Sequence, residues 1–77
     1  MPHVTVQVLI EQDEDGKFVA SCPNLEGCYT QGDTFEEAIE NIRDVIQMCL
    51  EELRGEGRQH DLKFPEIIGV KRLDIAV

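Results

Sequence analysis

The chain has 77 residues, and sixteen acidic against seven basic side chains give it a formal net charge of −9. A chain of this length forms one small domain, in which one sheet face packed on one helix is about all the core it can bury. The negative charge repels nucleic-acid phosphates and favours a basic partner, although solubility alone explains it equally well.

Alternating apolar and polar residues predict two strands at the start of the chain. Residues 3–12, HVTVQVLIEQ, place three valines and Ile10 on one face, which is typical of a half-buried strand. Asp15 and Gly16 then indicate a reversal, because glycine reaches positive φ without steric cost. Residues 17–22, KFVASC, alternate again, so we expect an antiparallel hairpin.

The next segment, CPNLEGCYTQGDT, brackets a turn with Cys22 and Cys28. Such a pair could be half of a metal site, a redox pair, or two residues flanking a loop. The spacing differs from that of zinc ligands, and three cysteines are an odd number for disulfides. Pro23 cannot donate to a sheet and Asn24 favours a turn, so we expect a turn and then a short strand over 28–31. Cys22 and Cys49 are then interpreted as small buried hydrophobes.

A helix is predicted from Thr34 to Arg54. Thr34 and Glu37 form a capping box, and apolar residues recur at three- and four-residue steps from Phe35 onward, so one stripe faces the sheet. Gly55 and Gly57 are expected to end the helix. The outward face is acidic, with Glu36, Glu37, Glu40, Asp44, Glu51 and Glu52.

The C-terminal part is predicted to be a loop followed by a last strand. Phe64, Ile67 and Ile68 in the loop could lie under the helix end or belong to an interface. Residues 70–77, VKRLDIAV, alternate and indicate a strand. The expected fold class is therefore α+β: a three-stranded antiparallel meander, one long helix on one sheet face, and a final strand (βββαβ).

The chain lacks the patterns of an enzyme, a nucleic-acid-binding protein or a membrane protein. It has no Gly-rich phosphate loop, helix-turn-helix or basic aromatic patch. A two-metal nuclease needs a carboxylate in its first strand, where this chain has Thr5 and Gln7. A cysteine nucleophile needs a nearby histidine, and His3 and His60 are far from the cysteines in sequence. We predict no catalytic residue, metal or cofactor, and no direct nucleic-acid binding. No long apolar run or signal peptide is present, so we expect a soluble cytoplasmic protein.

The run DEDGKFVASCPNLEGCYTQGDTFEEAIENIRDVIQMCLEEL, residues 13–53, resembles the HicB-like family of antitoxins from toxin–antitoxin pairs. The resemblance implies a partial ribonuclease-H-like fold without that enzyme's active site, and a homo-oligomer, a dimer or tetramer. It also implies binding to a small basic HicA-type toxin, an mRNA interferase. Full-length members carry a C-terminal DNA-binding segment that this chain lacks, so we expect a single HicB-like domain over 1–77.

The predicted function is neutralisation of a HicA-like toxin ribonuclease by masking its active face. The candidate contacts form two patches, and the hairpin acids and turn residues of the first protrude together if the hairpin and the turn lie at one edge. They are Asp13, Glu14, Asp15, Asn24, Leu25 and Glu26 in the first patch, and Glu36, Glu40 and Asp44 in the second. For any one of them a merely solvated side chain is the commoner case.

Two alternatives stay open at this point. One is a stand-alone homo-oligomeric structural or regulatory module without a toxin, held by edge pairing of the last strand. Lys71 and Arg72 in that strand are also the kind of charge that blunts edges. The other is a residual hydrolase that uses Cys28 or the acids.

Overall fold

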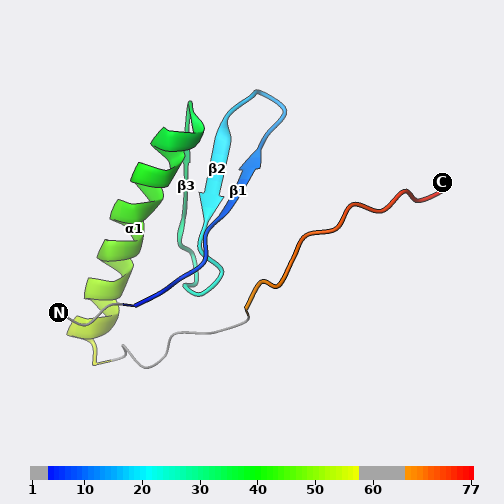
Figure 1. Ribbon diagram of the computed structural model, residues 1–77. Coiled ribbons are helices and arrows are strands. Elements are labelled where there is room, and N and C mark those ends of the chain that lie inside the picture. Colours follow the sequence, from blue (N-terminus) through cyan, green and yellow to red (C-terminus); the bar gives the residue numbers. More distant parts are fainter. Residues whose placement is uncertain (1–3, 58–65) are drawn as a thin grey trace.

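A computed structural model describes residues 4–57 and 66–77 of the chain. Its elements are the strands β1 (Leu9–Gln12), β2 (Phe18–Ser21) and β3 (Tyr29–Gly32), followed by the helix α1 (Phe35–Gly55). The strands form one antiparallel sheet in the order β1-β2-β3, and α1 runs beside β3 along the sheet (Figure 1). The α+β class and the meander followed by one long helix are confirmed.

The predicted hairpin is present, with a shorter first strand than the alternation suggests. Gly16 has a φ of +84°, and the Asp13 N–H donates to the Lys17 carbonyl at 2.9 Å to close the turn. Pairing runs from Gln12 opposite Phe18 to Leu9 opposite Ser21. Residues 4–8 do not form a strand, because β2 ends at Ser21, two residues before Pro23, and offers them no ladder partner.

The core lies between α1 and the sheet. Ala20 of β2 and Ala38 and Ile42 of α1 are almost completely buried. Small side chains at positions 20 and 38 let the helix approach the sheet closely, which is how a chain of this size reaches core packing density. The core is completed by Cys22, Leu25, Cys28 and Ile46, with Val6, Val8, Ile10 and Phe18 partly buried against it.

The ends of α1 agree with the predicted caps. Thr34 accepts a hydrogen bond from the Glu37 N–H at 3.0 Å, and the Glu37 carboxylate accepts from the Asp33 N–H at 3.3 Å instead of from Thr34 itself. At the other end the helix stops at Gly55, and Gly57 follows with a φ of +70°. Within the described ranges the structure contains no helix that is long and apolar enough to cross a membrane.

The predicted final strand is not present in this structure. Residues 66–77 have no regular secondary structure and run away from the sheet (Figure 1). A strand requires a neighbour for its backbone groups, and the three-stranded sheet of this chain does not extend to them. Ile67 is half-buried and Ile68 is exposed, whereas Phe64, His3 and His60 lie outside the described residues.

Candidate protein-binding surface

The structure separates the two groups whose joint protrusion required a single edge, the hairpin acids and the turn residues. The hairpin acids sit in the β1–β2 turn and residues 24–26 sit in the β2–β3 turn, at opposite ends of the sheet (Figure 1). The condition for joint protrusion, a single edge, is not met because consecutive turns of an antiparallel meander necessarily lie at opposite ends of the shared strand.

Two of the three turn residues do not protrude. Asn24 is 5% exposed and Leu25 is 6% exposed. The Asn24 side-chain oxygen accepts a hydrogen bond from the Gln7 backbone N–H at 2.9 Å. The Asn24 side chain thus takes the place of a neighbouring strand for this residue of the segment before β1. Leu25 belongs to the core, and only Glu26 presents its side chain to solvent. The expected protrusion is therefore wrong for Asn24 and Leu25.

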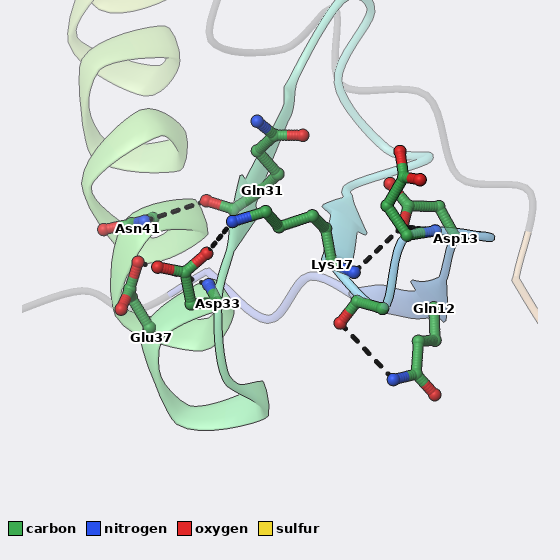
Figure 2. A network of polar contacts seen from close by, with 9 residues as sticks. Gln12, Asp13, Lys17, Gln31, Asp33, Glu37 and Asn41 are labelled. Carbon is green, nitrogen blue, oxygen red and sulfur yellow. Dashed lines mark hydrogen bonds and ion pairs between the residues drawn. The ribbon is translucent and has the colours of Figure 1, made fainter.

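The hairpin acids instead lie beside the start of the helix. Gly32, the last residue of β3, pairs with Phe18 at the hairpin end of β2, so α1 begins at that end. Lys17 forms an ion pair with Asp33, directly before the helix cap (Figure 2). We call this surface the acidic end and define it by exposed carboxylates from the hairpin and the helix start: Asp13, Glu14, Asp15, Asp33, Glu36 and Glu37.

Three of these acids act on Lys17. The pKa of Lys17 is raised, first by its hydrogen bond and ion pair with Asp33, and further by the negative charges of Glu37 and Asp13. Acids from the hairpin, the β3–α1 link and the helix thus act on one ammonium group. The six carboxylates of the acidic end outnumber this one ammonium group, so the surface has an excess of negative charge that attracts a basic protein.

The acids of the hairpin have different roles. The Asp13 carboxylate accepts from the backbone N–H groups of Asp15 and Lys17 at 3.0 and 2.9 Å, so it holds the turn in shape (Figure 2). Within residues 4–57 and 66–77, the carboxylates of Glu14 and Asp15 form no hydrogen bond or ion pair. These two are therefore available to a partner, while Asp13 is committed to the fold.

The predicted helix patch is exposed and continues from the acidic end. Glu36, Glu40 and Asp44 are four residues apart, so they form one row along α1. The Asn41 side chain donates to the Gln31 carbonyl at 2.9 Å and ties this part of the helix to β3 (Figure 2). Glu36 joins the hairpin acids, whereas Asp44 lies two turns farther along the helix.

Sequence reasoning missed Asp33 and Lys17 as members of this surface. The available signal was the register: two hairpins in a meander bring the residue before Phe18 next to the residue after Gly32. Their opposite charges then predict a cross-strand pair.

An apolar groove lies between α1 and residues 4–8, the segment before β1. It has a volume of about 660 Å³. One side is formed by Val4, Val6 and Val8 and the other by Ile39, Ile42 and Ile46, with Thr5, Arg43, Gln47 and Leu50 completing the lining. The groove forms because α1 packs over β2 and β3 and leaves the β1 side uncovered.

The cysteines lie in the interior, and their chemistry opposes the hydrolase alternative. Cys22 and Cys28 are buried and Cys49 is partly buried. Burial, with the neighbouring Cys49 and Cys22 thiols, raises the pKa of Cys28 to about 12. A neutral thiol is a poor nucleophile, so Cys28 is unsuited to catalysis at neutral pH. In the described part of the chain, no three His, Cys, Asp or Glu side chains are grouped so as to hold a metal ion.

The Cys28 thiol predicts a loss of stability at high pH. In the unfolded chain this thiol ionises above its ordinary pKa of 9.0, whereas in the folded chain it stays protonated up to about 12. The unfolded state is therefore favoured as pH rises above 9.0, by at most about 1.4 kcal/mol per pH unit. Urea unfolding from about pH 8 to about pH 11 should show this decline. The Cys28→Ala variant should be less stable but decline less steeply; an equal slope in both proteins would contradict the assignment.

Comparison with known proteins agrees with the resemblance seen in the sequence. Residues 6–71 match the family described as HicB_like antitoxin of bacterial toxin-antitoxin system. The UPF0150 protein ssr1258 of Synechocystis sp. is 44% identical over 66 residues, covering 86% of this chain and 87% of that protein. The UPF0150 protein ssr1765 of the same organism is 47% identical over 70 residues, covering 91% and 85%. The UPF0150 protein Ta0767 of Thermoplasma acidophilum is 43% identical over 58 residues, covering 75% and 78%.

No solved structure matches the chain at a significant level. The family match spans most of the sequence and includes all three strands and the helix. The chain therefore belongs to the HicB-like family of bacterial antitoxins.

Proposed function

We propose that this chain neutralises a small, basic HicA-type mRNA interferase by binding it and covering its active face. Membership of an antitoxin family supports the antitoxin role. The observation that carries the choice of surface is the acidic end, where exposed acids of the hairpin, the β3–α1 link and the helix start lie close enough to act on Lys17. A toxin that binds RNA phosphates requires a basic surface, and the acidic end is complementary in charge to such a surface.

The proposed mechanism is steric masking helped by charge. Complementary charge raises the rate of encounter, and the fit of the two surfaces then decides how long the complex lasts. Glu14 and Asp15 make the first contacts in this proposal, and Glu36, Glu40 and Asp44 extend them along the helix. Glu26 lies at the other end of the sheet, so it would have to serve a separate contact.

The proposal is tested by purifying the full chain, tagged, from its native host. We expect a small basic protein to elute with it at a defined stoichiometry, and to cleave RNA only after the two are separated. A homo-oligomer that elutes without a partner at every salt concentration would overturn the proposal.

The second candidate function is a stand-alone homo-oligomeric module with a structural or regulatory role. The observation in its favour is the exposed apolar tail over residues 70–77, which offers a surface for self-association. Under either function, we propose that the chain is a single-domain cytoplasmic protein. It would have no enzymatic activity and would not bind nucleic acid directly. Both candidate functions also include the partial ribonuclease-H-like fold that the family resemblance implies, although 70–77 does not form its fourth strand within the single chain described.

A further inference from the structure

The tail, residues 70–77, carries apolar side chains that the rest of the described structure leaves exposed. Leu73 is 69% exposed and Ile75 is 73% exposed, and Val70 and Val77 are exposed as well. Leu73, Ile75 and Val77 alternate with charged or small residues, which is the pattern of a strand with one buried face. A contiguous apolar row of this kind on a small protein indicates a contact surface.

A pair of hydrogen bonds fixes the point at which the tail leaves the domain. The Ile67 N–H donates to the Gln7 side-chain oxygen at 2.6 Å, and the Gln7 side-chain nitrogen donates to the Ile67 carbonyl at 3.0 Å. Gln7 thus satisfies both backbone groups of Ile67, as a neighbouring strand would. Beyond this anchor the tail runs away from β1 of its own chain (Figure 1).

The outer side of β1 can receive a strand. β1 is at the edge of the sheet, with β2 as its only neighbour among the described residues. Beside it lies the apolar groove between residues 4–8 and α1. The outer backbone groups of such an edge strand lack a hydrogen-bonding partner, and the apolar groove beside it lacks side chains to cover it.

We propose that the tail of one copy pairs as a strand with the outer edge of residues 4–12 in a second copy, and that two copies exchange tails reciprocally. The eight tail residues span about 26 Å when extended, close to the span of the nine residues of the receiving segment. The alternation then turns Leu73, Ile75 and Val77 together toward the apolar groove of the partner.

A second copy fits better than a different protein for two reasons. Every copy has one tail and one uncovered β1 edge, so a two-fold exchange occupies both of them in both chains. The tail also carries Lys71 and Arg72, while the charged side chains of residues 4–57 are mostly acidic, so charge favours contact between tail and partner. This inference concerns the chain alone and does not depend on the toxin.

The test compares the full-length chain with two single variants by sedimentation equilibrium over a range of concentrations. The wild type should be a dimer. Ile75→Lys places a charge on the apolar row, and because it acts at both contacts of a symmetric dimer it should weaken dimerisation roughly 100-fold or more. Asp74→Lys adds a lysine on the opposite face of the same strand and should leave the dimer nearly unchanged.

Hydrogen–deuterium exchange of the same proteins distinguishes the other occupants of the edge. In an exchanged dimer the amides of 70–77 are protected, and this protection disappears on dilution and in the Ile75→Lys variant. A monomeric wild type would overturn the proposal, with concentration-independent protection indicating that the tail folds onto its own chain. A dimer that survives Ile75→Lys, or whose tail amides exchange freely, would also overturn it because another surface would then hold the copies together.

Discussion

Replacing Gly32 with alanine is expected to lower the free energy of unfolding by about 3 kcal/mol, because overpacking against backbone cannot be relieved by a rotamer change. A Cβ at this position would lie 2.7 Å from the Ala38 nitrogen and 3.0 Å from the Glu37 carbonyl carbon. These are backbone atoms in the first turns of α1, so the helix itself must move away from β3. Domains of this size are stable by roughly 4–12 kcal/mol, so the loss is a large fraction of the total.

Gly55→Ala is the matched control for this prediction. Gly55 is the last residue of α1, and among the described residues no atom outside its own helix turn lies within 4 Å of the position that its Cβ would take. Alanine favours the helix over glycine, so this variant should be as stable as the wild type or more stable by up to about 1 kcal/mol. Urea unfolding of the three proteins measures the difference. Equal stability of the Gly32 and Gly55 variants would show that β3 and α1 are not in the close contact described.

The parts of the fold that sequence predicted correctly are those determined by neighbours along the chain. The turn at Gly16 requires only the positive φ that glycine allows. The helix start requires only Thr34 and Glu37, three residues apart, and the apolar stripe follows from the helical period. Each of these signals lies within one element or one turn, so no knowledge of tertiary packing was needed.

The parts that sequence did not predict depend on contacts between distant segments. Asparagine is typical of exposed turns, but Asn24 is buried because its side chain accepts a hydrogen bond from the Gln7 N–H, seventeen residues earlier. Lys17 and Asp33 meet only because two hairpin registers place them at the same end of the sheet. The strand pattern of 70–77 is clear in the sequence, but its partner is not provided by the sheet of this chain.

Replacing Glu14 and Asp15 together with lysine is expected to slow binding of the basic toxin by about tenfold or more at low salt, because complementary charge acts mainly on the rate of association. The difference from the wild type should shrink as salt is added, since exposed charges are screened beyond about 10 Å at 0.1 M. Asp13 is left unchanged because its carboxylate holds the turn through the Asp15 and Lys17 N–H groups. Stopped-flow or surface-based kinetics with the co-purified toxin, over a range of salt concentrations, measures the effect.

The control is Glu51→Lys with Glu52→Lys, which makes the same change in net charge near the far end of α1. These side chains are also exposed, so neither double variant should disturb the core. If the acidic end guides the toxin, the first variant slows association far more than the second. An equal loss in both would mean that net charge alone attracts the toxin. No loss in either would remove the acidic end from the interface and leave the antitoxin role itself to be decided by the co-purification.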